Sequence, residues 1–344
     1  MAYTTINKSK EHFDTLLYTA TGTQSVTGAE FQPDLSWVKS RSTTSSHYLL
    51  DAVRGSTKTV KSDSTDAEGT QNLITSFNSD GVTLGSANWS DGRTAVIWNW
   101  KANGAGSSNT DGSVSSTVSV NTTAGFSIVS YTANGNAGTT IGHGLNAVPS
   151  MIITKDRDAS GLWLVYHAKS DSSAPQNKYL ELNSTGTVQD YPVWNDTAPT
   201  SSVFTIGTAS ENNTNGRNII AYCFAEKQGY SKFGSYTGNG NADGTFVYTG
   251  FKPAFIIHKR TDATGNWNMH DSTRSLINTA DERLYSNLSN AEDSGGDYGD
   301  DILSNGFKIR TTEASWNASG GSFIYMAFAE APLVGTNNVP CTAR

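Results

Sequence analysis

The stretch Phe251–Arg274, FKPAFIIHKRTDATGNWNMHDSTR, indicates how this chain is built. It reads as a strand, a turn and a second strand, and its framework occurs three times. The other copies begin FQPDLSWVKS at Phe31 and AVPSMIITKD at Ala147. In each copy a proline is followed six residues later by a lysine: Pro33 and Lys39, Pro149 and Lys155, Pro253 and Lys259. Such a repeat indicates that the chain is built of three similar structural units.

The residues around each copy predict many short strands. The two-residue period of a strand places Leu35, Trp37 and Lys39 on one face. Each unit closes on a strongly apolar strand: AVIWNW from Ala95, IIAYCFAE from Ile219 and FIYMAFAE from Phe323. Because both faces of these strands are apolar, we expect them to be covered on both sides. We therefore predict an all-β protein of three tandem β-sandwich domains. A β-propeller is disfavoured, since units of about 105 residues fit no blade.

The repeats also suggest domain boundaries. We expect a first sandwich with its lead-in over 1–104, a Gly/Ser/Thr-rich connector over 105–124, a second sandwich over 125–228, a third over 229–336 and a tail over 337–344. The connector ends in STVSVNT, which can also pair as a strand. The short join between the second and third units predicts limited freedom, whereas the connector predicts a hinge after the first unit.

Composition excludes several classes of protein. A net charge of −7 and the lack of a basic patch argue against a nucleic-acid partner. No apolar run is long enough to cross a bilayer, and the N-terminus lacks the apolar segment of a signal peptide, so we expect synthesis in a cytosol and no membrane partner. Two cysteines make no disulfide framework, and Cys223 is predicted to be a small core residue in an apolar strand.

One set of charged residues is repeated and is the main candidate for a site. Lysine, aspartate and arginine recur at fixed spacing in the first and third copies, as Lys39, Asp51 and Arg54 and as Lys259, Asp271 and Arg274. A lysine that ends an apolar strand face needs an acidic partner, and the aspartates are the obvious candidates. The set is either a polar ligand site or an ion-pair latch between neighbouring strands. We favour the latch, because such pairs are rarely catalytic outside a cleft. The second copy has His167 at the aspartate position.

Other motifs predict structure and not chemistry. The hairpins YTANGN at Tyr131 and YTGNGN at Tyr236 are tight turns, since no helix start or lysine follows to make a phosphate loop. The six histidines lack the spacing of a zinc motif, and no cysteine lies near them, so we expect no metal site and no cofactor. The acidic run from Glu292 to Asp301 lacks the EF-hand pattern and is predicted to be a solvated loop.

Several blocks together resemble a known family. These are the opening MAYTTINKSKEHFDTLLYTATG, the blocks FQPDLSWVKSR and GFKPAFIIHKRTDATGNW, and the ending YMAFAEAPLVGTNNVP. They are similar to repeat-bearing structural proteins of tailed, mainly marine, bacteriophages, over nearly the whole chain. The resemblance implies a virion component with concanavalin-like or lamin-G-like jelly-roll sandwiches, assembled in the host cytoplasm. It supplies no catalytic residues. The second copy departs from the family pattern, with Ala147-Val148-Pro149 in place of Phe-x-Pro.

We therefore expect a non-enzymatic virion protein, in a tail fibre or attached to the tail, that acts in surface display or host adhesion. Its partners would be other virion proteins and a host surface glycan or protein, and family analogy suggests a homotrimer. The alternative is a capsid decoration or head-fibre protein. A glycan-degrading enzyme would need two carboxylates flanking a groove, and no closely spaced acidic pair such as ExDxE is present.

Overall fold

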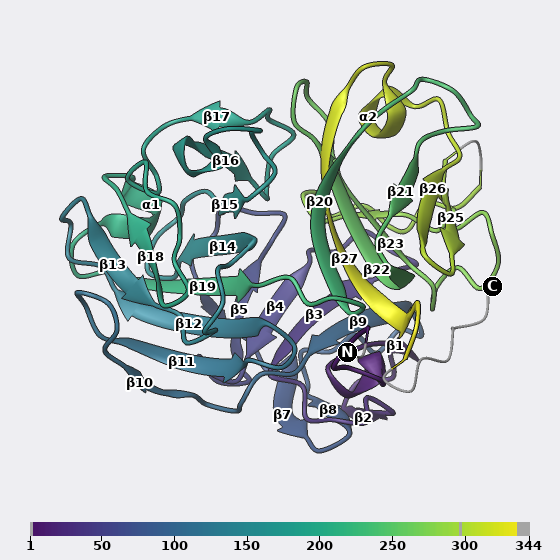
Figure 1. Ribbon diagram of the computed structural model, residues 1–344. Coiled ribbons are helices and arrows are strands. Elements are labelled where there is room, and N and C mark those ends of the chain that lie inside the picture. The colour runs from purple at the N-terminus through teal and green to yellow at the C-terminus, as the bar shows by residue number, and fades with distance from the viewer. Residues whose placement is uncertain (1–2, 296–297, 336–344) are drawn as a thin grey trace.

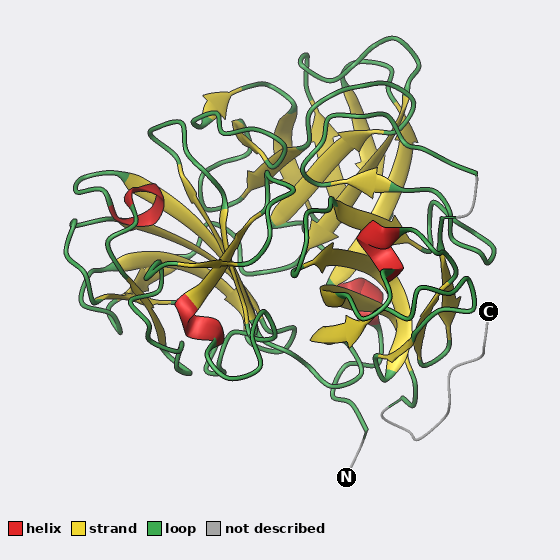
Figure 2. Cartoon of the chain, turned by 90° about the horizontal axis from the view of Figure 1, so that it is seen from above, coloured by secondary structure: helices red, strands yellow, loops and turns green. Residues whose placement is uncertain are grey.

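The computed structural model describes residues 3–295 and 298–335. Nearly all of its regular structure is strand, and the helices are single turns (Figure 2). The predicted all-β sandwich class is therefore confirmed. Among the described residues, none of the helices has the length and apolar character that crossing a membrane requires. The predicted tail at 337–344, with Cys341, lies outside the described residues.

The first part of the chain forms two antiparallel sheets, which we call repeat one. Its lead-in contains the short helix η1 (Ser9–Glu11). The larger sheet has the order β1 (Phe13–Thr19), β9 (Thr94–Trp100), β3 (Leu35–Ser40), β4 (Tyr48–Asp51), β5 (Lys58–Lys61) and β6 (Gly69–Thr70). The smaller sheet has the order β2 (Gln24–Thr27), β8 (Gly81–Leu84) and β7 (Ile74–Asn78).

Repeat two has the same plan. Its larger sheet has the order β10 (Ser107–Asn109), β11 (Ser116–Asn121), β12 (Phe126–Thr132), β19 (Asn218–Phe224), β14 (Met151–Asp156), β15 (Leu164–His167), β16 (Lys178–Glu181) and β17 (Gln189–Asp190). The smaller sheet pairs β13 (Thr139–Gly142) with β18 (Val203–Ile206), and the short helices are η2 (Pro175–Asn177) and α1 (Ser210–Asn213). The predicted connector is thus not a free linker, because β10 and β11 lie within it and join this sheet.

Repeat three also consists of a larger and a smaller antiparallel sheet. Its larger sheet has the order β20 (Ser231–Thr237), β27 (Ser322–Pro332), β22 (Phe251–Arg260), β23 (Trp267–Asp271) and β24 (Leu284–Tyr285). Its smaller sheet has the order β21 (Phe246–Tyr248), β26 (Gly306–Ile309) and β25 (Asp300–Leu303), and α2 spans Ala314–Asn317. In every repeat the strand that bears the repeated lysine lies between the closing apolar strand and the strand that follows it in sequence.

The closing strands are buried on both faces, as their sequences predict. In β9, Ile97 belongs to a core between the two sheets of repeat one, whereas Val96 and Trp98 face the other way into a second core. Repeats two and three have equivalent inner cores between their own sheets. The larger sheets therefore carry apolar side chains on both faces.

The second core is shared by all three repeats. The larger sheets face one another around it, with repeat one purple to blue, repeat two teal and repeat three green to yellow (Figure 1). The equivalent residues of the closing strands meet there: the Phe328 ring centroid lies 5.8 Å from that of Trp100 and 6.0 Å from that of Phe224. Aromatic residues bury 150–250 Å² each, so this core gives a large apolar contribution to stability. The expected hinge after repeat one is wrong, because its sheet packs directly against the other two.

Candidate functional site

The aspartate and arginine of the repeated set form an ion pair within one turn. Asp51 ends β4, and one of its carboxylate oxygens accepts hydrogen bonds from the backbone N–H groups of Val53 and Arg54 at 3.1 and 2.9 Å. The other oxygen lies 2.5 Å from Arg54 Nε, and both side chains are fully buried. Asp271 and Arg274 repeat this arrangement after β23. The pairing is therefore local, between residues three apart, and makes a rigid charged unit at the end of the strand.

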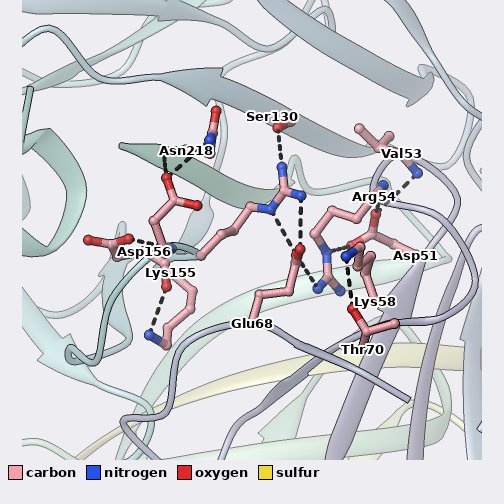
Figure 3. A network of polar contacts seen from close by, with 12 residues as sticks. Asp51, Val53, Arg54, Lys58, Glu68, Thr70, Ser130, Lys155, Asp156 and Asn218 are labelled. Carbon is pink, nitrogen blue, oxygen red and sulfur yellow. Dashed lines mark hydrogen bonds and ion pairs between the residues drawn. The ribbon is translucent and has the colours of Figure 1, made fainter. Parts of the chain in front are cut away.

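A glutamate joins this unit to the next repeat. Glu68 lies beside Arg54, whose Nη1 is 3.2 Å from Glu68 Oε2 (Figure 3). Arg157 of repeat two approaches the same carboxylate with Nε at 2.8 Å and Nη2 at 3.1 Å. Burial alone would raise the pKa of Glu68, but the guanidinium groups of Arg157 and Arg54 hold that pKa below its ordinary value. Glu68 thus ties repeats one and two together.

A second network of the same kind joins repeat three to repeat one. Glu292 Oε2 lies 2.9 Å from Arg274 Nη1, and Glu292 Oε1 lies 2.6 Å from Arg41 Nη2. The pKa of Glu292 is also below its ordinary value, because these guanidinium groups outweigh the effect of burial. Arg41 follows Lys39 by two residues, as Arg157 follows Lys155. The two networks therefore occupy equivalent places in the repeats.

A backbone contact occurs at all three junctions, but among the described residues no ion pair joins repeats two and three. The N–H of Glu68 donates to Arg157 O at 2.8 Å, and that of Glu292 donates to Arg41 O at 2.7 Å. At the third junction the N–H of Val188 donates to Thr261 O at 3.0 Å. The three backbone contacts run from each repeat to the next and back to the first, so the repeats form a closed ring.

His167 stands at the aspartate position of this third junction, as the alignment of the repeats predicts. Its Nε2 lies 3.1 Å from the backbone oxygen of Tyr325, in the neighbouring repeat. Burial lowers the pKa of His167 to about 4. The residue is therefore a neutral hydrogen-bond donor that joins repeat two to repeat three where the other junctions use ion pairs.

The lysines of the repeated set do not pair with the aspartates, and this part of the latch hypothesis is wrong. In the antiparallel register Asp51 lies opposite Leu35, and Lys39 is four residues further along β3, or about 13 Å away. Asp271 lies opposite Phe255 in the same way, four residues before Lys259. The sequence spacing was compatible with contact, but the strand register separates the groups.

The lysines instead donate to backbone oxygens, and for Lys39 and Lys259 one of these belongs to the neighbouring repeat. Lys39 Nζ lies 2.7 Å from Ser40 O and 3.4 Å from Ser289 O of repeat three, and Lys259 Nζ lies 2.7 Å from Arg260 O and 3.3 Å from Thr185 O of repeat two. Lys155 donates to Asp156 O at 2.8 Å and to Ala159 O at 3.3 Å, both within repeat two. All three side chains are buried, and burial lowers the pKa of each ammonium group to about 8.

Two further features were not found by sequence reasoning. An open cleft of about 720 Å³ lies between repeats two and three, and its lining includes the polar side chains of Asp171, Ser235, Thr237 and Asp262. Separately, three buried residues of repeat three, His258, His270 and Asp300, bring potential metal ligands within 4.8 Å of one another. Neither was visible in the sequence, because each depends on which strands become neighbours.

Comparison with known families gives a match over most of the chain. Residues 8–332 match the profile of a family described as a domain of unknown function, DUF7483. Neither the curated proteins nor the solved structures contain a match to this chain. The matched segment includes all three repeats and both charged networks, so the chain belongs to the DUF7483 family.

Proposed function

We propose that this protein is a non-enzymatic structural component of a tailed-phage virion, in a tail fibre or attached to the tail, that acts in surface display or host adhesion. The observation that carries the proposal is the shared core, which joins three sandwiches into one body. A particle protein has to keep its shape outside the cell, and here large buried aromatic clusters supply stability without a disulfide among the described residues. The resemblance to phage structural proteins supports the same assignment.

The buried charges support a structural role. Arg54 and Arg274 are each held by an aspartate and a glutamate, and the buried lysines by backbone oxygens. Groups that are fully occupied by protein partners stabilise one arrangement of the repeats. We therefore assign these networks to the junctions of the ring and not to a ligand site.

The cleft between repeats two and three is the surface that we assign to adhesion. Hydroxyl and carboxylate groups of Ser235, Thr237, Asp171 and Asp262 line it. Such groups can hydrogen-bond the hydroxyls of a host surface glycan. A substitution that fills the cleft tests this assignment: S235W should abolish binding of labelled protein to host cells. T27W, at an exposed strand position of repeat one, is the matched control.

The virion location has a direct test. Antibodies raised against the purified chain should label the tails of intact virions in immunogold electron microscopy. Labelling of the head would favour the decoration protein, and unlabelled virions in which the protein is undetectable by mass spectrometry would contradict both. We further propose that the chain assembles as a homotrimer with other virion proteins; native mass spectrometry of the purified protein should give the trimer mass, and a strict monomer would count against it.

A further inference from the structure

We propose that repeat three contains a binding site for a divalent first-row transition-metal ion, formed by His258, His270 and Asp300. His258 lies on β22 and His270 on β23, neighbouring strands of the larger sheet, whereas Asp300 begins β25 of the smaller sheet. The site is therefore inside the sandwich, where an ion would link its two layers. All three side chains are fully buried.

The separation of the potential ligand atoms suits an ion better than a direct hydrogen bond. One nitrogen or oxygen from each residue lies within 4.8 Å of the others, and His258 Nε2 is 3.6 Å from Asp300 Oδ2. A nitrogen–oxygen hydrogen bond would need about 2.7–3.2 Å. Two ligand atoms on a tetrahedral zinc ion, each bonded at about 2.0–2.1 Å, are separated by about 3.3 Å. The observed pair is close to that value.

Five polar side-chain atoms of the cluster have no hydrogen-bond partner. Both carboxylate oxygens of Asp300, both ring nitrogens of His270 and Nε2 of His258 are buried without a hydrogen bond. Burying an unpaired polar group destabilises the folded state, and burying an unpaired charged group does so more strongly. One such atom from each residue lies within 4.8 Å of the others, and a bound cation would give a partner to the Asp300 carboxylate and to one nitrogen of each imidazole. Imidazole and carboxylate are suitable ligands for such ions.

Repeat one has aliphatic residues at the positions that these three residues occupy in repeat three. His258 precedes Lys259 in the strand as Val38 precedes Lys39, and His270 precedes Asp271 as Leu50 precedes Asp51. Asp300 lies opposite the last residue of β26, as Ile74 lies opposite the last residue of β8. In repeat one, Val38, Leu50 and Ile74 pack together in the inner core. Repeat one thus has three aliphatic residues at these positions, and repeat three has a potential metal ligand at each of them; repeat two, with Thr154 and Tyr166 at the first two positions, has neither set.

The neighbouring side chains fix the orientation of the imidazoles. Nδ1 of His258 lies 3.4 Å from the hydroxyl of Tyr236, which donates to the backbone oxygen of Trp316 at 2.8 Å. This leaves Nε2 of His258 to face Asp300. The indole of Trp316 stands nearly perpendicular to both imidazoles, with ring centroids 4.8 and 4.6 Å away. Such contacts hold the rings of metal-binding histidines in position.

Metal analysis of the purified protein tests the site, with Zn²⁺ as the probe. The full chain, without an affinity tag, is loaded with Zn²⁺, dialysed against metal-free buffer and analysed by inductively coupled plasma mass spectrometry. We expect one zinc ion per chain. Removing the ion with a chelator should lower the melting temperature, and adding Zn²⁺ back should restore it. A folded protein with no retained zinc and no response of the melting temperature to Zn²⁺ would overturn the proposal.

Two variants separate metal binding from folding. H258V/H270L/D300I installs the residues that repeat one has at these positions, so the fold should be kept, with an unchanged circular dichroism spectrum, and zinc should be lost. H167Q removes a buried histidine outside the cluster and should retain zinc at the level of the unmodified chain. Equal zinc content in the folded triple variant and the unmodified chain would contradict the assignment.

Discussion

Arg41 of repeat one forms an ion pair with Glu292 of repeat three, although 251 positions separate them in the chain. Their closest atoms are 2.6 Å apart, and the two side chains are only 19% and 11% exposed. Together with Glu68 and Arg157 at the next junction, this pair joins the repeats in a closed ring around the shared core. The first and last parts of the sequence therefore depend on each other for stability.

Neutralising Glu292 should weaken the ring. The change E292Q leaves the guanidinium groups of Arg41 and Arg274 without their shared carboxylate, and we expect the free energy of unfolding to fall by about 2–4 kcal/mol. Urea denaturation measures the difference. The matched control is D190N, which breaks the ion pair of Lys178 with Asp190, a carboxylate that is 67% exposed, and should lower the free energy of unfolding much less. Equal losses in the two variants would refute a special role for Glu292.

The buried lysines predict that stability rises with pH in mildly alkaline solution. Lys39, Lys155 and Lys259 have pKa values lowered by burial to about 8, against about 10.4 in an unfolded chain. Between these values the unfolded state binds more protons than the folded state, so the free energy of unfolding increases with pH there. Each lysine should raise the free energy of unfolding by up to about 3 kcal/mol between about pH 8 and about pH 10.4.

Comparison with a lysine-free variant isolates this effect. K39M/K155M/K259M keeps side chains of similar length and removes the titrating groups. Urea denaturation at pH values from 7.5 to about 9.5 should show a flatter pH dependence for the variant than for the unmodified chain. Parallel curves for the two proteins would show that these ammonium groups keep ordinary pKa values.

His167 predicts sensitivity to acid. Burial lowers the pKa of His167 to about 4, so between pH 6.5 and 4 the unfolded state binds a proton that the folded state does not. The free energy of unfolding should therefore decrease as pH falls through this range, by about 3 kcal/mol from this residue. H167Q keeps a neutral donor for the Tyr325 backbone oxygen and should lose less stability over the same range. Identical acid dependence in thermal melts of both proteins would argue against this role.

Cys223 gives a simple probe of the inner core of repeat two. Its side chain is fully buried on β19, and burial raises the pKa of its thiol, so the reactive thiolate is scarce in the folded protein. In a C341S background, a thiol reagent should label the native protein only at the rate of unfolding and label it promptly in urea. Rapid labelling without denaturant would mean that β19 is exposed to solvent.

Much of the fold follows from the sequence. The Pro–x₅–Lys spacing and the alternation around Trp37 place one strand correctly in each copy, and the closing strands are buried on both faces as their composition predicts. The turn prediction for the two Asn-Gly segments agrees with positive φ values at Gly135 and Gly240, but the segments are not hairpins, because each connects strands of two different sheets. These features are local, so residues near one another in sequence determine them.

The candidate site was harder to predict, because it depends on contacts between distant strands. The pairing of Lys39 with Asp51 failed because the register, and not the number of intervening residues, decides which side chains meet. His258 and His270 are separated by a turn, and Asp300 comes from another sheet, so no compact motif marks the cluster. The sequence does contain one indication of the junctions between repeats. An arginine follows Lys39 and Lys155 by two residues, at the positions that join the repeats.

Differential scanning calorimetry of the full chain tests most directly whether the three repeats form one body. A shared core and a closed ring predict a single unfolding peak whose calorimetric and van't Hoff enthalpies agree. Separate peaks, or a calorimetric enthalpy about three times the van't Hoff value, would mean that the repeats unfold independently, and would contradict this account.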